Sequence, residues 1–360
     1  MGNALRKPGR SVHDAPPRAR SHRPAFLPES RGAWLKGARG HQLLDLDNDD
    51  GQVLLGWNDA GISRAISEAD GDTSALMGQL ASQLSARVIG AEAVAFAPSL
   101  SDALASTLMA AKALTGRDGA FLCDEATALS GDVETLEQAV SRHADQLAAL
   151  VIRPLDVPRR FLMRARLVTE RIGAVLIFDE SRSMLRVHDA GVAGLYGVGA
   201  DVTVLGPALA NGRAIGAICG HYEIMRAVHS DLSALSPAAL REALIAGLHV
   251  LSRFDTLDGP RALAVVGAEI EVECARALRR HGADGLFELC GDPAWSVVRA
   301  RDDGQLGGRI RDELSAGLEA AGVMSLGSHV PSLAIDESHV AHMVAAYDAV
   351  LPALVARHGA

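Results

Sequence analysis

Short apolar runs alternate with stretches of helical periodicity through the middle of the chain. The runs expected to form strands are residues 93–96, 119–123, 148–153, 174–178, 202–205 and 215–219. The stretches with apolar positions at helical spacing are residues 100–114, 133–143 and 160–171. Apolar runs separated by amphipathic helices are typical of a mostly parallel sheet with helices on both faces. The pattern therefore predicts an α/β fold for this region.

After residue 236 the pattern changes to that of a smaller α+β domain. Helical spacing is present in residues 236–252, 260–281, 306–321 and 337–356, and short strands are expected at 286–289 and 296–299. A chain of 360 residues is also longer than one core usually fills. We therefore expect a basic, poorly ordered arm at 1–32, an N-terminal segment at 33–75 that contributes to the small domain or to an interface, a large α/β domain at 76–255 and a small α+β domain at 256–360.

Composition fits an ordinary globular protein, with 48% hydrophobic and 22% charged residues. No apolar run approaches membrane-spanning length, and the N-terminus has no apolar signal-peptide core. The cysteines are scattered and form no metal-ligand spacing, so we expect buried free thiols in a reducing cytosol rather than metal ligation. They are Cys123, Cys219, Cys274 and Cys290. The sequence thus predicts a cytoplasmic protein without a membrane or metal site.

Charge is concentrated at the N-terminus, where residues 1–40 hold nine basic and two acidic groups although the whole chain has a net charge of −9. A basic arm of this kind can bind phosphate or nucleic acid. The alternative is a leader, or an arm that lies on an acidic partner subunit. We favour the alternative and expect no nucleic-acid partner, because the arm has little aromatic interleaving and the body is acidic.

Two strand ends carry polar residues suited to a ligand. Asp179 follows the apolar run 174–178, and a carboxylate there can hold a cationic ring nitrogen or simply cap the next turn. Ser99 and Ser101 lie between a predicted strand and a predicted helix, where hydroxyl and free N–H groups suit a phosphate or serve as an ordinary helix cap. The loop 206–212 either approaches a ligand closely or forms a plain turn.

Three arginines and three lysines complete the list of candidates. The arginines can grip a carboxylate or lie on the surface, and they are Arg182, Arg186 and Arg213. The lysines are the only ones in the chain, and they are Lys7, Lys36 and Lys112. No lysine is present from Arg117 to the end of the sequence.

Taken in order, several segments resemble the class III aminotransferases, and especially glutamate-1-semialdehyde aminomutase-like proteins. They are residues 43–48, 96–103, 115–118, 173–180, 197–206, 215–220, 322–330 and 345–352. The resemblance runs from about residue 33 to residue 354. It implies the fold-type-I fold of pyridoxal-phosphate enzymes, and a dimer with its sites at the subunit interface. In such enzymes a lysine amine after the strand 202–205 holds the cofactor as a Schiff base.

The sequence also departs from the family pattern at the positions that hold the cofactor. The lysine position is Pro207, which has no amine, and the glycine of the phosphate turn is Leu100. The acidic residue before Pro154 is Arg153, a reversal of charge. The segment with the ring-stacking Tyr-His pair, expected after Cys123, is missing. The phosphate-binding threonine is not identifiable in residues 230–237.

Three hypotheses follow. The first is a non-catalytic partner subunit, which forms a homodimer or a heterodimer with an active paralogue in a biosynthetic pathway. The second is an enzyme with changed chemistry in the old cleft, and the third is an ordinary aminotransferase or aminomutase with a displaced lysine. We expect no catalytic residue and no covalently bound cofactor. A vestigial cleft formed by Asp179, Ser99 and Ser101 stays compatible with pyridoxal or pyridoxamine phosphate bound without a covalent link.

Overall fold

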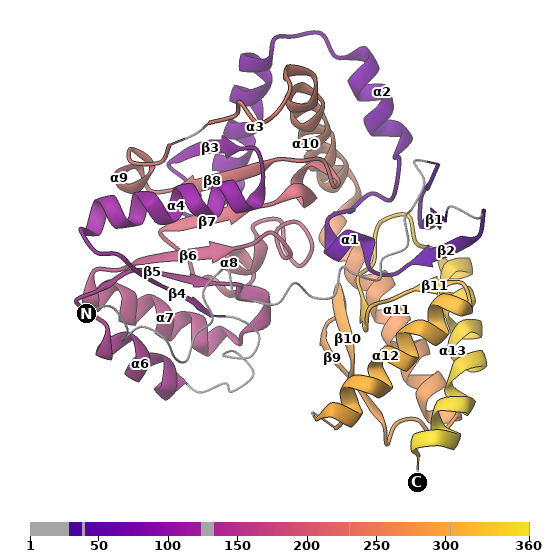
Figure 1. Cartoon of the computed structure of the whole chain (residues 1–360). Helices are drawn as coiled ribbons and strands as arrows, with labels where there is room; N and C mark the ends of the chain where they lie inside the picture. Colours follow the sequence, from indigo (N-terminus) through magenta and orange to yellow (C-terminus); the bar gives the residue numbers. More distant parts are fainter. Residues whose placement is uncertain (1–28, 38–39, 124–132, 230, 303, 360) are drawn as a thin grey trace. The chain divides into compact units, whose positions relative to one another are not determined.

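The computed structural model describes residues 29–37, 40–123, 133–229, 231–302 and 304–359 (Figure 1). These residues form two compact units, which we call unit 1 (69–248) and unit 2 (29–68 and 249–360). The division at 249 lies inside a long helix, several residues before the boundary near 255 expected from the sequence. Most of the basic arm at 1–32 lies outside the described residues.

Unit 1 is built on a six-stranded sheet with the order β3-β8-β7-β6-β5-β4. Its strands are β3 Ala93–Ala97, β4 Gly119–Cys123, β5 Leu147–Ile152, β6 Val175–Asp179, β7 Val202–Leu205 and β8 Gly216–Gly220. Strands β4 to β7 pair in parallel, whereas β8 runs antiparallel to both β7 and β3. The predicted mostly parallel sheet is confirmed, and all six strands expected from the sequence are present.

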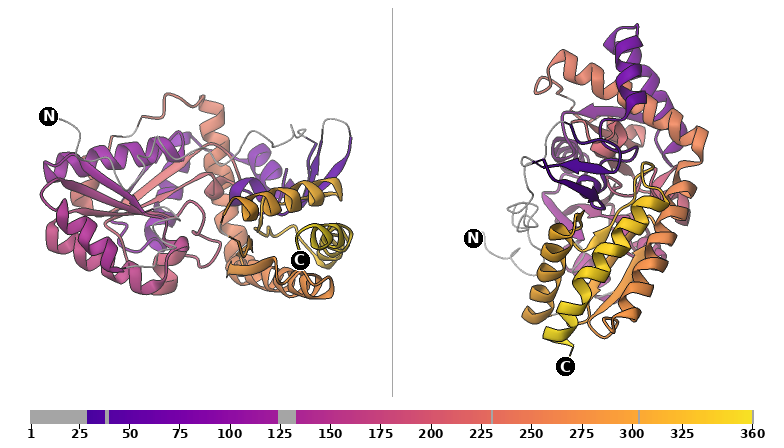
Figure 2. Two further views of the ribbon diagram at one scale, coloured as in Figure 1. Left: turned by 60° about the horizontal axis from the view of Figure 1, so that its bottom comes forward. Right: turned by 90° about the vertical axis from the view of Figure 1, so that its right-hand side faces the viewer.

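Helices cover both faces of this sheet (Figure 2). The helices of unit 1 are α3 Thr73–Arg87, α4 Leu100–Thr115, α6 Val133–Arg142, α7 Arg159–Ile172, α8 Gly191–Tyr196 and α9 Tyr222–Met225, with most of α10 Pro237–Leu257. One core cluster joins α4 to residues such as Ala149 and Val151, and the other joins α6 and α7 to Leu150 and Ile152. Alternate residues of β5 therefore enter opposite cores, as the two-residue period of a strand requires.

Unit 2 combines two small sheets with long helices. Its strands are β1 Trp34–Lys36, β2 Gln42–Asp45, β9 Phe287–Asp292, β10 Trp295–Ala300, β11 Val323–Met324 and β12 Ser328–His329. They form sheets with the orders β1-β2-β11 and β12-β10-β9. The helices are α1 Asn48–Gly51, α2 Ala60–Glu68, α11 Gly259–Arg280, α12 Gln305–Ala320 and α13 Glu337–His358. The long helices and the strand pair after residue 286 were expected from the sequence, whereas the pairing of β11 with β2 was not.

Helix α13 corrects one expectation. It is long and apolar enough to cross a membrane by length and composition alone, although the sequence analysis expected no such run. Its residues Val340, Met343, Tyr347 and Leu351 are buried in the core of unit 2, together with residues of α11 and α12. Packing within the unit thus accounts for the buried positions, which make up 33% of the apolar window.

A buried polar group links α13 to the sheet β12-β10-β9. The His329 Nε2 atom lies 2.9 Å from the Tyr347 hydroxyl, and its Nδ1 atom lies 3.5 Å from Ser296 Oγ. Burial lowers the pKa of His329 to about 4, because the imidazolium form would lose its hydration. His329 is thus neutral in the fold over the physiological pH range.

His329 should make unit 2 sensitive to acid. Its folded pKa lies below the ordinary 6.5, so its contribution to stability is present above pH 6.5 and is lost as pH falls toward 4. Replacement by Gln should remove this loss, which amounts to about 1.4 kcal/mol per pH unit. Chemical unfolding can be followed by tryptophan fluorescence, because all three tryptophans, Trp34, Trp57 and Trp295, lie in unit 2.

Asp45 gives unit 2 a second pH dependence of stability, opposite in sign to that of His329. Burial raises its pKa to about 6, so its contribution to stability increases as pH falls from 6 toward 3.8. The contribution of Asp45 is the same in wild type and in His329→Gln, so it cancels when the two are compared. Tyr347→Phe is the matched control, because it removes the hydroxyl partner and keeps the imidazole. Equal pH dependence in wild type and His329→Gln would contradict the assignment.

Candidate functional site

The carboxyl ends of the parallel strands meet at one edge of the unit 1 sheet. Strand β3 runs in the same direction as β7, because both are antiparallel to β8. The ends of β3, β7, β6 and β5 are therefore at the same edge, as is the start of β8. Ligands of open parallel sheets bind at such an edge, and the sequence candidates Asp179, Ser99 and Ser101 belong to it.

Asp179 ends β6 and is 3% exposed. Its Oδ1 atom accepts a hydrogen bond of 3.1 Å from the backbone N–H of Ser181. Its Oδ2 atom lies 3.3 Å from Nε of Arg153, whose side chain is 36% exposed. Both the turn-capping role and a charge partner are thus present at this carboxylate, and the charge partner is a residue that the sequence analysis noted only as a departure.

Glu180 follows Asp179 and is also buried, at 1% exposure. Its carboxylate accepts hydrogen bonds from the backbone N–H groups of Val192 and Ala193, at 3.0 and 2.9 Å, and from the hydroxyl of Ser183. Burial nevertheless raises the pKa of Glu180 to about 7, because lost hydration outweighs these three donors. This side chain connects the end of β6 to the start of α8, and the sequence analysis missed it.

The turn between β3 and α4 is capped by its own residues. Ser99 is the N-cap of α4, and its hydroxyl accepts from the backbone N–H of Asp102 and donates to the Asp102 carboxylate at 2.6 Å. Ser101 is exposed. Leu100 packs against the core cluster on the α4 face of the sheet. The geometry is that of an ordinary helix cap, the alternative that the sequence analysis left open.

The turn after β7 is closed by Pro207. Gly206 is extended and Pro207 begins the 3₁₀ helix η3 Pro207–Ala210, where its missing N–H and fixed φ angle are tolerated. A Cβ atom at Gly206 would lie 2.9 Å from Cβ of Ser181 and 3.7 Å from Cδ2 of Leu100. The ends of β6 and β7 and the start of α4 are therefore in close contact around Gly206.

One small cavity lies beside this turn. A cavity of about 10 Å³ lies between the segments 180–185 and 205–209, which is room for about one water molecule. An aromatic ring does not fit into it.

The three candidate arginines lie in different environments. Arg186 is 1% exposed and lies in the segment between β6 and α8, while Arg182 and Arg213 are half-buried. A fully buried arginine is rare unless it is paired, so Arg186 is better described as part of the structure of this segment than as a surface group. A carboxylate-binding role stays a prediction for all three.

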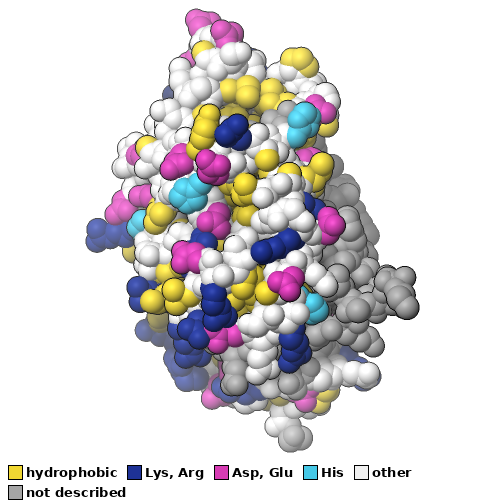
Figure 3. All heavy atoms as spheres, turned by 90° about the vertical axis from the view of Figure 1, so that its left-hand side faces the viewer, with side chains coloured by type: hydrophobic (Ala, Val, Ile, Leu, Met, Phe, Trp, Pro, Cys, Tyr) yellow, Lys and Arg dark blue, Asp and Glu magenta, His cyan; other side chains and the backbone are white. Residues whose placement is uncertain are grey.

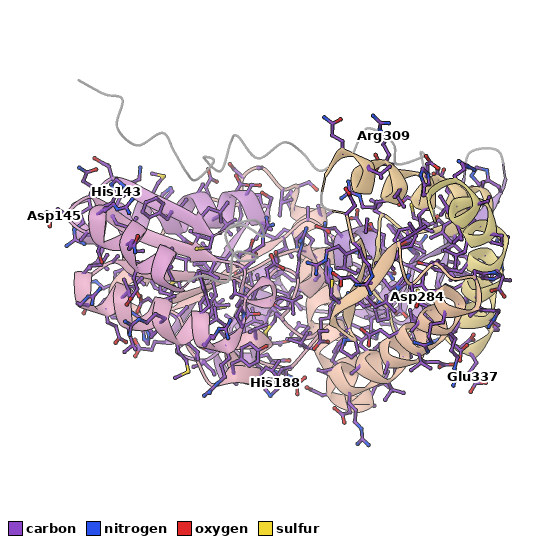
Figure 4. All side chains as sticks on the ribbon, turned by 90° about the horizontal axis from the view of Figure 1, so that it is seen from below. His143, Asp145, His188, Asp284, Arg309 and Glu337 are labelled. Atoms are coloured by element: carbon purple, nitrogen blue, oxygen red, sulfur yellow. The ribbon has the colours of Figure 1, made fainter. Side chains whose placement is uncertain are left out.

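No metal site is present among the described residues. They contain no group of three His, Cys, Asp or Glu side chains that could hold a metal ion. Within unit 1, His188 lies away from His143 and Asp145 (Figure 4). Cys123, Cys219 and Cys274 are buried, as expected from the sequence, whereas Cys290 is half-buried.

Comparison with known proteins identifies relatives of this chain. No protein-family model matches it. It is 26% identical to the glutamate-1-semialdehyde 2,1-aminomutase of Leptospira biflexa over 327 residues, which cover 76% of this chain and 75% of the relative. The same enzyme of Pyrobaculum calidifontis is 28% identical over 339 residues, covering 79% of this chain and 74% of the relative.

Solved structures have the same fold. The FumI protein of a Sphingopyxis species, determined in its PLP internal aldimine form, aligns with a TM-score of 0.80 and 22% identity over 92% of this chain and 89% of its own. An omega-transaminase from Sphaerobacter thermophilus aligns with a TM-score of 0.76 and 22% identity, over 91% of this chain and 90% of its own. The chain therefore has the fold of the PLP-dependent aminotransferases, as the sequence resemblance implied.

Glu180 should make unit 1 less stable at higher pH. Its folded pKa of about 7 lies above the ordinary 4.5, so its contribution is fully present below pH 4.5 and is lost as pH rises through 7. Glu180→Gln removes this dependence. At pH 5 the variant should be less stable than wild type by about 1–2 kcal/mol, because the amide NH₂ faces a backbone N–H. The difference in stability between wild type and Glu180→Gln should become smaller toward pH 8.

Scanning calorimetry of the whole chain between pH 5 and 8 measures this difference. Ser183→Ala is the matched control, since it removes one donor and leaves the carboxyl group able to titrate. A gap between wild type and Glu180→Gln that is constant across this pH range would show that Glu180 does not titrate there.

Proposed function

We propose that this chain, which is similar to the glutamate-1-semialdehyde aminomutases and has the fold of the PLP-dependent aminotransferases, is a non-catalytic member of the class III aminotransferase family. In this proposal it serves as the partner subunit of another chain in a biosynthetic pathway. The observation that carries the proposal is Pro207. It follows β7 at the position to which the resemblance assigns the Schiff-base lysine. It begins the turn η3, and no residue of that turn carries an amine.

The positions of the lysines support the proposal. Lys112 is exposed in the last turn of α4, twelve residues beyond Leu100, where α4 begins. A helix rises 1.5 Å per residue, so Lys112 lies about 18 Å along the axis from the strand-end edge. Lys36 belongs to β1 of unit 2, and Lys7 lies outside the described residues. No lysine follows Lys112 in the sequence.

The surroundings of Pro207 also fit a covalently held cofactor poorly. A Schiff-base enzyme needs an amine at the cofactor carbonyl, a carboxylate free to hold the ring nitrogen and a cup for the phosphate. Here the Asp179 carboxylate is paired with Arg153, and the Ser99 hydroxyl is engaged with Asp102. Each of the groups that the chemistry requires is replaced or has a partner within the chain, so we derive no reaction step for it.

Assembly with a second chain is the other half of the proposal. The family resemblance assigns residues 62–89, 236–253 and 43–55 to an interface, and these segments are rich in apolar residues. Many of those residues are buried within this chain alone, including Leu44, Leu80 and Leu244, so their composition does not by itself mark an interface. Assembly with a second chain is therefore proposed from the family resemblance.

Exposed apolar side chains are distributed over several helices. The large apolar residues of unit 1 that are more than 40% exposed are Ile89, Met109, Leu114, Met163, Leu167, Leu195 and Tyr222. On the face shown in Figure 3, apolar areas are interrupted by charged side chains. Large apolar side chains that are scattered singly are normal on a protein surface, so these positions do not locate the interface.

The first prediction of this proposal is that no Schiff base forms. The protein should purify without colour. Treatment with pyridoxal phosphate and then borohydride should attach no pyridoxyl group to residues 202–220, because no amine lies in that segment. Peptide mass spectrometry measures the label.

An active aminotransferase treated in parallel provides the positive control. A stoichiometric pyridoxyl label on one lysine of this chain, with an absorbance band that disappears on reduction, would overturn the non-catalytic assignment.

The second prediction is a stable dimer. Size-exclusion chromatography with light scattering at micromolar concentration should give twice the 37.6 kDa mass of the chain when the protein is expressed alone. A dimer covers exposed apolar area that would otherwise promote aggregation. A well-behaved monomer at this concentration would contradict the partner-subunit role.

A further inference from the structure

The pair formed by Arg153 and Asp179 follows directly from the register of the sheet. Strands β5 and β6 are parallel neighbours, and Ile152 pairs with Phe178. Arg153 follows Ile152, and Asp179 follows Phe178, so these two side chains are adjacent at the same edge. Neighbouring strands lie about 4.8 Å apart, and residues in register interact as cross-strand pairs. An acidic residue at position 153 would repel Asp179, whereas arginine neutralises it.

The pairing leaves no carboxylate oxygen of Asp179 without a donor. Oδ1 accepts from the backbone N–H of Ser181, and Oδ2 faces Nε of Arg153. A cationic ring nitrogen that approached Asp179 would need the position that Arg153 holds. The carboxylate is 3% exposed, so loss of its partner would leave a buried charge without compensation.

A second departure from the family pattern lies at the start of α4, beside the end of β7. Leu100 follows the cap residue Ser99, and its Cδ2 atom lies near Gly206, the residue before Pro207. A branched side chain there takes up space between the start of α4 and the end of β7. A phosphate needs close approach to backbone N–H groups at a helix start, which the glycine of the family pattern permits and a leucine side chain restricts.

We infer that Arg153 is an internal counter-ion that takes the place of a cofactor's cationic ring at Asp179, and that Arg153 and Leu100 together exclude pyridoxal and pyridoxamine phosphate from the cleft. This inference rests on the proposed absence of Schiff-base chemistry. It goes beyond that absence, since a missing lysine alone does not prevent non-covalent binding. It also identifies the role of Arg153, which is to neutralise the buried strand-end carboxylate of Asp179.

The test uses pyridoxamine 5′-phosphate, which carries the ring and the phosphate but no aldehyde to react with surface amines. Calorimetric titration of wild type should give no saturable binding up to about 1 mM. The double variant Leu100→Gly/Arg153→Gln should bind at least tenfold more tightly, because Asp179 is then free and space is open at the start of α4. Arg153→Gln alone should lie between the two.

Two matched controls locate the effect. Arg153→Lys keeps the positive charge beside Asp179 and should behave as wild type does. Addition of Asp179→Asn to the double variant should abolish the gained binding, because the ring nitrogen loses its carboxylate. If Leu100→Gly destabilises α4, then wild type, Arg153→Gln and Arg153→Lys still carry the test.

The inference is overturned if wild type binds pyridoxamine phosphate as tightly as the variants, or if no folded variant that lacks Arg153 binds it better. These results are distinguishable from failure of the proposed function. Binding of pyridoxamine phosphate without borohydride labelling would overturn only the exclusion by Arg153, whereas labelling of a lysine would overturn the non-catalytic assignment itself.

Discussion

A parallel sheet that is buried on both faces can carry charged side chains only at the ends of its strands. In unit 1 this constraint decides where polar chemistry lies. All six residues of β5 are buried, and so are all five residues of β6, including Asp179. The helices α4, α6 and α7 cover the faces, so Arg153, Asp179 and the Ser99 turn are at the edge where the strands end. The placement of this site is a consequence of the sheet.

A carboxylate at such an edge must have a partner, and this chain supplies partners from within. Asp179 is paired with Arg153, and Glu180 with the backbone at the start of α8. Ser99 caps α4 through Asp102. Cofactor-binding groups of an enzyme stay available to a ligand, at a cost to stability. The corresponding groups here have partners within the chain.

Much of this fold is encoded in local sequence patterns. Apolar runs predicted all six strands of the sheet. The fully buried strands β5, β6 and β7 pair in parallel, and such strands are continuous in hydrophobicity. Features that depend on contacts distant in sequence could not be predicted in this way. The pairing of β11 with β2 joins Val323 to Leu44, and neither segment indicates its partner. The division of α10 at residue 249 is likewise set by packing, since the helical pattern continues across it.

The candidate site was predicted in part. The position of Asp179 at a strand end, and the cap at Ser99, follow from local sequence. The contact of Arg153 with Asp179 does not, because it requires the register of β5 against β6. Glu180 was missed because its three donors lie three to thirteen residues away and form only when the following turn folds back.

One structure determination tests the central claim most directly. Crystals of the wild-type protein grown in pyridoxal phosphate at about millimolar concentration should show Arg153 Nε within hydrogen-bond distance of Asp179 Oδ2, and no cofactor ring beside that carboxylate. A ring nitrogen bound to Asp179, with Arg153 displaced from it, would contradict the account.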